Sequence, residues 1–180
     1  MSHVVLDRDG TLIRHIPYLH DPSQVEILPT VREGVEALLH AGHKLYLHTN
    51  QSGIGRGRFT LEQASACNEA MLRLLGLGMD LFQDMCISPE RPDEEVLYRK
   101  PSPNFGLELL AKYGMAKNDL YYLGDNLTDL LTARNIGCRG AGVDTGGHDL
   151  RRMLRDQGLE GEYPVFDRFI DAAEYVIADG

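Results

Sequence analysis

Two carboxylates stand where a short apolar run meets a glycine. Asp7 and Asp9 follow the run at residues 3–6 and precede Gly10 and Thr11. A strand points residues i and i+2 the same way, so both side chains are expected to converge beyond its end. Paired acids resist ionising together unless a cation or a catalytic task keeps them there. Mg²⁺ suits such a pair, because it prefers carboxylate and carbonyl oxygens and keeps waters that a phosphate can share. For this motif alone, a solvated Asp-Gly turn is the alternative.

Three further polar motifs follow downstream, at residues 48–53 (H-T-N-Q-S-G), 98–101 (Y-R-K-P) and 123–129 (L-G-D-N-L-T-D). A hydroxyl and successive backbone N–H groups, as in the first, can hold phosphate oxygens. Lys100 in the second can offset charge on a carboxylate and a phosphoryl group. In the third, Asp125 can complete a metal site with Asp7, and Asp129 can support it by hydrogen bonds. Taken singly, each has a plain alternative: a self-capping loop, a solvated basic pair or an Asp N-cap.

The elements that must position these motifs alternate between strand and helix. We expect strands at 4–6, 44–48, 85–87, 120–123 and 139–143, and helices at 30–40, 60–75, 102–113, 128–135 and 170–177. Thr30 with Glu33, and Thr60 with Gln63, have the spacing of capping boxes. Long loops are expected at 13–29 and 88–103, the second of them functional. This alternation predicts an α/β fold with a mainly parallel sheet and helices on both faces, in a single domain over residues 1–180.

The expected sheet places the motifs at one edge. The motifs at 7–9, 49–53 and 124–125 each come directly after an expected strand. In parallel α/β sheets, ligands bind beyond the carboxyl ends of the strands. The sequence therefore predicts one site at this edge.

Composition narrows the choice of partners. The formal net charge of −9 argues against a protein that binds nucleic acid through its phosphate backbone. A small phosphorylated substrate remains compatible, because local Lys, Arg and metal override the global sign. We expect no membrane partner, since no apolar run approaches the ~20 residues that span a bilayer. The three cysteines are far apart and odd in number, which favours reduced thiols and a cytoplasmic location.

Together, the order and spacing of the four motifs resemble those of the haloacid dehalogenase (HAD) superfamily of phosphatases, over essentially the whole chain. The runs L-D-R-D-G-T-L, T-N-Q-S-G-I-G-R-G and R-K-P are similar to the heptose 1,7-bisphosphate and histidinol-phosphate phosphatase branch, whose members lack a large cap domain. The resemblance implies a Rossmann-like HAD fold and hydrolysis of a phosphate monoester.

It also implies roles for individual residues. Asp7 would be the nucleophile that forms an aspartyl phosphate, and Asp9 the general acid and base. Mg²⁺ would be held by Asp7, the Asp9 main-chain carbonyl and Asp125. Thr49, Asn50 and Lys100 would hold the transferring oxygens. The residues expected to approach the rest of the substrate are His15, Tyr18, Arg56, Arg99 and Asn126, with Gly10, Thr11 and Asp129 in support. Arg8 should point away from the two acids, and His20 and His48 are interpreted as structural or solvated.

The chain departs from this branch in the loop before Lys100. Many members bind a structural zinc through C-x-H and C-x-C pairs, but here Cys86 is followed by Ser88, and no cysteine lies between Cys86 and Arg99. One cysteine cannot supply a tetrahedral zinc site, so we predict no zinc. The substrate is expected to be a small phosphorylated metabolite, with a heptose bisphosphate leading. Histidinol phosphate or another small ester, a polynucleotide 3′-phosphatase and an inactive binding scaffold are the alternatives. A monomer or a small homo-oligomer is expected.

Overall fold

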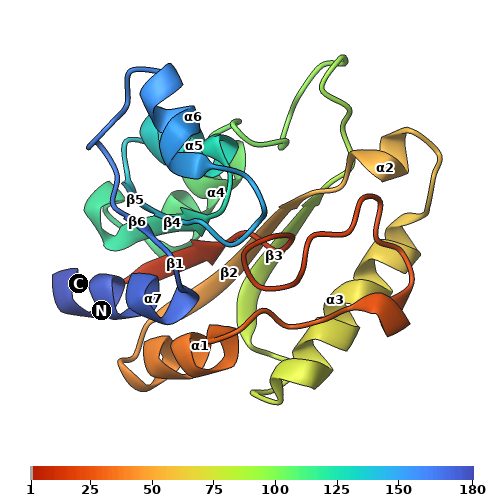
Figure 1. The fold of residues 1–180 in the computed structure, drawn as a ribbon, viewed down its shortest axis with the longest axis horizontal. Helices are drawn as coiled ribbons and strands as arrows, with labels where there is room; N and C mark the ends of the chain where they lie inside the picture. Colours follow the sequence, from red (N-terminus) through yellow and green to blue (C-terminus); the bar gives the residue numbers. More distant parts are fainter. Residues whose placement is uncertain (1) are drawn as a thin grey trace.

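The centre of the fold is a twisted parallel sheet, seen in a computed structural model that describes residues 2–180 (Figure 1). Its strand order is β3-β2-β1-β4-β5-β6, and every neighbouring pair is parallel. The strands are β1 (His3–Leu6), β2 (Lys44–Asn50), β3 (Phe82–Ser88), β4 (Leu120–Gly124), β5 (Arg139–Val143) and β6 (Val165–Phe166). The predicted α/β architecture is confirmed.

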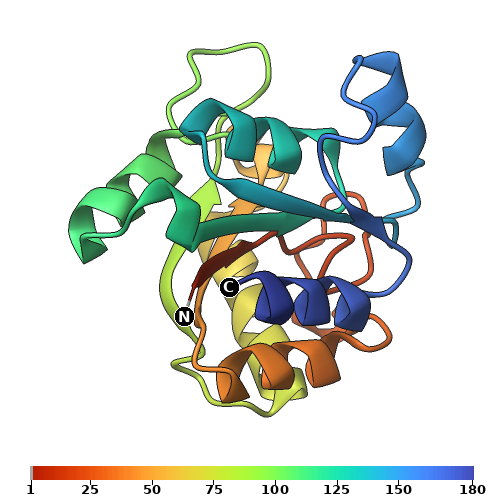
Figure 2. The ribbon, with the colours of Figure 1, turned by 90° about the vertical axis from the view of Figure 1, so that its left-hand side faces the viewer.

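Helices cover both faces of this sheet (Figure 2). Side chains alternate along a strand, so β1 sends Val4 and Leu6 to one face and Val5 to the other. The first face packs against α1 (Val31–His40), α3 (Leu61–Leu75) and α7 (Phe169–Asp179), and the second against α4 (Asn104–Tyr113) and α5 (Leu127–Ile136). Because both faces are covered, the middle residues of the central strands β1, β2 and β4 are buried and mostly apolar.

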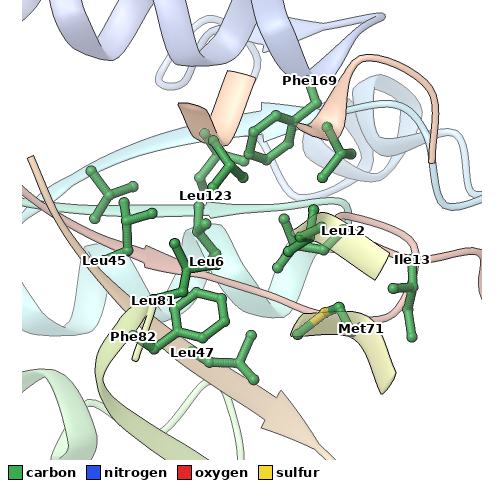
Figure 3. Packing of buried hydrophobic residues seen from close by; sticks show 14 of the residues in the cluster. Leu6, Leu12, Ile13, Leu45, Leu47, Met71, Leu81, Phe82, Leu123 and Phe169 are labelled. Carbon is green, nitrogen blue, oxygen red and sulfur yellow. The ribbon is translucent and has the colours of Figure 1, made fainter. Parts of the chain in front are cut away.

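The larger core cluster lies on the face of α1, α3 and α7 (Figure 3). It includes Leu12, Ile13, Leu19 and Val25, so the expected loop at 13–29 is partly a core element. Isolated bridges join Ile13 to Asp9 and to Ile27. This packing holds the segment that follows the two acids close to the sheet.

Of the two capping boxes that the sequence predicts, one is present in the structure and the other is not. The capping box of α3 is confirmed, because Thr60 Oγ accepts from Gln63 N at 3.3 Å and Gln63 Oε1 accepts from Thr60 N at 2.9 Å. The capping box predicted at Thr30 is wrong. Thr30 is left-handed, with φ 63°, and its hydroxyl accepts from Ile170 N at the start of α7 instead.

Three short elements were not expected from the sequence: α2 (Ser52–Gly55), α6 (Leu150–Asp156) and β6. α2 begins directly after β2, and α6 packs against α5 through a small leucine cluster. Within residues 2–180, each helix is too short or too polar to cross a bilayer. The prediction of a single domain over residues 1–180 stays a prediction.

Candidate active site

The carboxyl ends of β1, β2 and β4 meet at a cleft of about 230 Å³. Register sets this meeting, because Leu6 pairs with both Leu47 and Leu123, so the residues that follow emerge side by side. The cleft is lined by Asp7, Asp9, His15, Thr49, Asn50, Arg99, Lys100, Asp125, Asn126, Thr128, Asp129 and His148. The predicted motifs thus come together at one edge of the sheet, as in parallel α/β sheets generally.

A buried lysine bridges two acids at the floor of the cleft. Lys100 Nζ lies 2.6 Å from Asp7 Oδ1 and 2.6 Å from Asp129 Oδ1, with Lys100 only 3% exposed. Burial alone would lower the pKa of Lys100, but Asp129 and Asp7 raise it above its usual range. Lys100 is therefore a fixed positive charge beside the Asp7 carboxylate.

Asp125 completes an acidic cluster with Asp7 and Asp129, whose candidate ligand atoms all lie within 4.8 Å of one another. Burial, together with Asp7 and Asp129, raises the pKa of Asp125 well above its usual range. Thr11 is fully buried, and its hydroxyl is within donating distance of Asp7 Oδ2 at 3.2 Å and Asp125 Oδ1 at 3.3 Å. Three carboxylates share the Lys100 ammonium, so the cluster has room for a further positive charge. Carboxylates of this kind fit Mg²⁺.

Glycines allow the backbone to lie close to the carboxylates of the acidic cluster. Gly10 has φ +89°, and a Cβ on it would lie 2.4 Å from Asp125 Oδ2. A Cβ on Gly124 would lie 2.2 Å from the Asp129 carboxyl group, and one on Gly146 would lie 1.6 Å from Asp125 Oδ2. The backbone of two loops and of the last residue of β4 therefore lies directly against the acids, and a larger residue at these positions would displace them.

Asp9 faces a different set of partners. Its carboxylate accepts from Arg8 Nε at 3.0 Å, from Gln51 Nε2 at 2.8 Å and from the Thr49 hydroxyl at 3.3 Å. Each of these groups donates, so the three contacts together fix the orientation of the Asp9 carboxylate. The expectation that Arg8 points away from both acids is wrong. β1 ends at Leu6, and the chain then turns so that Leu12 N and Ile13 N donate to the Arg8 carbonyl, so strand alternation no longer applies.

Arg8 itself is buried under α3. Its Nη1 donates to Asn68 Oδ1 at 2.8 Å, and the residue is 0% exposed. A buried guanidinium that binds a carboxylate in a two-pronged manner fixes the position of that carboxylate. Arg8 is thus a support for Asp9, a role that the sequence analysis did not assign.

The segment carrying Lys100 is clamped from β2. Asn50 Oδ1 accepts from Lys100 N at 2.9 Å, and Asn50 Nδ2 donates to the Lys100 carbonyl at 3.3 Å. His48 Nε2 lies 2.9 Å from the Tyr98 carbonyl, and burial lowers the pKa of His48 to about 3. His48 is thus neutral and structural, in agreement with its interpretation. The side chain of Asn50 is occupied by the Lys100 backbone, and the role of the Asn50 amide in holding a transferring oxygen stays a prediction.

Asn126 is also engaged in local structure. It is the N-cap of α5, with its Oδ1 accepting from Thr128 N at 3.2 Å while Asp129 Oδ2 accepts from Asn126 N at 3.1 Å. The cap is therefore Asn126, and not Asp125, which leaves the Asp125 carboxylate for the acidic cluster.

The expected substrate residues lie at the rim. His15 and Arg99 line the cleft, and Tyr18 lines a neighbouring cleft of about 320 Å³ that shares Asp9, His15 and Asn50 with the first. The ring of Tyr18 lies under the Arg58 guanidinium, 4.6 Å from ring centroid to Cζ. Arg56 is exposed and lies outside the residues that line these two clefts, so its binding role stays a prediction.

The sequence analysis assigned no role to Thr128 and His148, which line the first cleft, or to Gln51, which lines the second. Gln51 directly follows β2, and its side chain and the Thr49 hydroxyl both donate to Asp9. His148 follows β5, and its ring centroid is 6.0 Å from that of His15 across the rim. The same strand-end rule that located Asp125 would have found it.

No zinc ligand set accompanies Cys86 in the part of the chain that the structure describes. Over residues 2–180, the acidic cluster is the one group of three or more His, Cys, Asp or Glu residues close enough to hold a metal. Cys86 packs beside the core of the α4 and α5 face, and burial raises the pKa of its thiol to about 12. The absence of zinc stays a prediction.

Comparison with known proteins agrees with this geometry. The HAD-hydrolase-like family matches residues 97–172. A probable D-glycero-D-manno-heptose-1,7-bisphosphate 7-phosphatase of Thermoplasma acidophilum is 34% identical over 139 residues, covering 76% of this chain and 86% of the relative. The similarity to this relative is longer than the segment that matches the family.

Solved structures show the same relationship. The crystal structure of D,D-heptose 1,7-bisphosphate phosphatase from B. bronchiseptica, complexed with magnesium and phosphate, superimposes with a TM-score of 0.88 and 28% identity over 100% of both chains. A further relative, identified by sequence, is the histidine biosynthesis bifunctional protein of Legionella pneumophila, which is 30% identical over 73% of this chain and 38% of the relative. The family match, the Thermoplasma relative and the shared fold establish that this chain belongs to the HAD-like family of phosphatases.

Proposed function

We propose that this phosphatase uses Mg²⁺ to hydrolyse a phosphorylated sugar through an aspartyl phosphate on Asp7, with a heptose bisphosphate as its leading substrate. The observation that supports this most strongly is the position of Lys100 Nζ, 2.6 Å from Asp7 in a cleft that also holds Asp9 and Asp125. A fixed cation beside an anionic nucleophile lowers the repulsion between that nucleophile and an incoming phosphate.

Asp7 carries out the first displacement. One of its carboxylate oxygens forms a bond to phosphorus while the bond from phosphorus to the substrate oxygen breaks. Lys100 and the Thr11 hydroxyl hold the Asp7 carboxylate, so its orientation is fixed before the substrate arrives. Thr49, at the end of the neighbouring strand β2, lines the same cleft, and it and the backbone around it would hold the transferring oxygens.

Asp9 moves the protons. In the first step it gives a proton to the leaving alcohol oxygen, and in the second it takes one from the water that attacks phosphorus and releases Asp7. The Arg8, Gln51 and Thr49 donors hold the Asp9 carboxylate in one orientation at the cleft, which supports a role for Asp9 in both proton transfers.

The acidic cluster fits the metal. Asp7, Asp125 and the Asp9 main-chain carbonyl would hold Mg²⁺, and Asp129 would support Lys100. When bound, Mg²⁺ would neutralise charge on the nucleophile and on the transferring group. Burial, followed by the neighbouring Asp7 and Asp129, raises the pKa of Asp125, and a bound cation would favour its carboxylate form.

The substrate assignment is supported by the relatives and by the rim. Two of the three proteins compared above carry the name of a heptose bisphosphate phosphatase, and a bisphosphate has a second anionic group that Arg99 at the rim can bind. Arg99 lines the cleft next to Lys100, and a guanidinium binds phosphate in a two-pronged manner. A small cleft of about 230 Å³ suits a metabolite better than a polymer.

A panel of phosphate esters tests the proposal. Phosphate release is measured with heptose 1,7-bisphosphate, histidinol phosphate, a hexose monophosphate and a 3′-phosphorylated oligonucleotide. We expect the highest kcat/KM for the heptose bisphosphate, with activity lost in EDTA and in Asp7→Asn. Preference for histidinol phosphate or for the oligonucleotide would overturn the substrate assignment. Turnover that survives both EDTA and Asp7→Asn would overturn the mechanism.

A further inference from the structure

The loop before Lys100 begins at the end of β3 and rises beside α2 before it returns to the cleft (Figure 1). Its first residues are tied to the end of β2, since Gln51 N donates to the Ser88 carbonyl at 2.7 Å and Gly55 N donates to the Pro89 carbonyl at 3.2 Å. Residues 92–97 are exposed. Because these residues are exposed, the part of the loop that leads back to Arg99 and Lys100 needs a contact of its own to hold it in place.

Glu90 supplies that anchor. Its Oε1 accepts from Tyr98 N at 3.0 Å, its Oε2 accepts from the Ser88 hydroxyl, and its carbonyl accepts from Arg99 Nη1 at 3.4 Å. Glu90 thus ties the start of the loop to its end at two points, Tyr98 and Arg99, while its contact with Ser88 stays within the start of the loop. Hydrogen bonds to an ionised carboxylate are stronger than those between neutral groups.

The charge of Glu90 is suited to this position. Burial raises the pKa of Glu90, but the hydrogen bonds from Ser88 and Tyr98 outweigh it, and the pKa lies below its usual range. The same carboxylate attracts the Arg99 guanidinium, which the nearby positive charge of Arg56 repels. Glu90 therefore favours one placement of Arg99 in two ways. Its backbone carbonyl accepts from the guanidinium, and its carboxylate attracts the same positive charge.

Other braces act on the neighbouring backbone. His48 lies against the Tyr98 carbonyl, and Asn50 holds both backbone groups of Lys100. These contacts secure the catalytic lysine without Glu90. The side chain of Arg99, half-buried at the rim, is bound by the Glu90 carbonyl.

We propose that Glu90 is a positioning residue that fixes Arg99 at the rim of the cleft, and that this placement recognises an anionic group of the substrate remote from the phosphoryl group that is transferred. The proposal rests on the proposed function for its substrate. Its physical basis is preorganisation, because an arginine already held in its binding geometry loses less conformational entropy when the substrate binds.

The loop offers a matched control. Glu94 is a second glutamate of the same loop, and its carboxylate accepts from Arg91 N at 2.8 Å, with no recorded contact to Tyr98 or Arg99 among residues 2–180. We expect Glu90→Ala to raise KM for a sugar bisphosphate about tenfold while kcat changes less than about twofold. Glu94→Ala should leave both constants unchanged. Glu90→Gln keeps an oxygen acceptor for Tyr98 N and should restore most of the loss.

Two further comparisons separate positioning from general loss of structure. In an Arg99→Ala background, Glu90→Ala should raise KM no further, since the residue it positions is gone. For a small phosphate monoester without a second anionic group, Glu90→Ala should not change KM. A KM increase that persists without Arg99, or that extends equally to the monoester, would overturn the proposal.

Hydrogen exchange provides a measurement that is independent of activity. Glu90→Ala should speed exchange at the Tyr98 amide, and Glu94→Ala should not. Unchanged protection at Tyr98 would overturn the proposal even if the enzyme were active. If the wild-type protein hydrolysed no sugar bisphosphate, the proposed substrate would fall, and faster Tyr98 exchange in Glu90→Ala would still support Glu90 as the anchor of the loop.

Discussion

Replacing Gly146 by alanine should weaken metal binding, although none of the proposed ligand residues is itself replaced. The Cβ of an alanine here would lie 1.6 Å from Asp125 Oδ2 and 2.5 Å from Asp125 Cγ. Ordinary contact begins at 3.4 Å, so the Asp125 carboxylate or the loop has to move by about 1.8 Å. Mg²⁺ holds its oxygen ligands at about 2.0–2.1 Å in near-octahedral geometry, so a displacement of this size takes Asp125 out of the coordination shell.

The expected magnitude follows from that displacement. Disturbing groups that merely orient a metal ligand costs about 10–100-fold in affinity or activity. Moving the ligand itself should reach the upper end of this range, about 100-fold in Mg²⁺ affinity, or about 2.7 kcal/mol. The three atoms nearest the new methyl group all belong to Asp125, so we expect the proposed nucleophile Asp7 to keep its pairing with Lys100 and activity to recover at high Mg²⁺ concentration.

Gly147 is the matched control. It has φ +79° with open space around its Cβ position, so Gly147→Ala strains the backbone without contacting Asp125. Titration calorimetry with Mg²⁺ and the Mg²⁺ dependence of turnover are measured for both variants. We expect Gly147→Ala to lose about 1 kcal/mol of stability and to keep its Mg²⁺ affinity. Equal Mg²⁺ affinity in Gly146→Ala and wild type would refute the assignment of Asp125 as a ligand.

The remaining predictions concern Lys100, His48 and zinc. Lys100→Met leaves two buried carboxylates without their cation and should cost about 3–5 kcal/mol of unfolding free energy and nearly all turnover, as measured by urea denaturation and phosphate release; near-wild-type stability would contradict the buried bridge. Burial lowers the pKa of His48 in the folded protein to about 3, whereas in the unfolded chain this pKa is about 6.5. Below pH 6.5 the unfolded chain therefore binds a proton that the folded protein does not, and the free energy of unfolding should fall as the pH decreases from about 6.5 towards about 3. Between pH 7 and pH 5, urea denaturation should show the wild type losing about 2 kcal/mol more than His48→Gln, and equal losses would refute a neutral buried His48. Metal analysis of protein purified without added zinc should find no stoichiometric zinc, and a near-stoichiometric amount would contradict the prediction.

Much of the fold follows from local patterns. The apolar runs that became β1, β2, β4 and β5 are each buried on both faces, so their composition alone marks them as central strands. The elements that were missed are short. β6 has two residues, too few to display a period, and the seven residues of α6 include four charges.

Thr30 illustrates where a local rule loses to tertiary structure. Its spacing to Glu33 is that of a capping box, but its hydroxyl binds the start of α7, far along the chain. Nothing near Thr30 in the sequence indicates that partner. The hydrogen-bond partner of a potential capping side chain depends on which groups the tertiary fold places beside it.

The candidate site was predictable to the extent that it lies at strand ends. Asp7 and Asp125 follow adjacent parallel strands, so their meeting is a consequence of topology. The Arg8 pairing and the Glu90 anchor were not predictable, because both depend on how irregular backbone turns after a strand. Strand alternation gives no direction to a side chain once the strand has ended.

The central claim is the covalent intermediate on Asp7, and the stereochemical course at phosphorus tests it most directly. A substrate with a chiral, isotopically labelled phosphoryl group is hydrolysed in labelled water, and the configuration of the product is determined. Transfer first to Asp7 and then to water inverts phosphorus twice, so the account predicts net retention. Net inversion would mean that water attacks the substrate directly, and Asp7 would then not be the nucleophile.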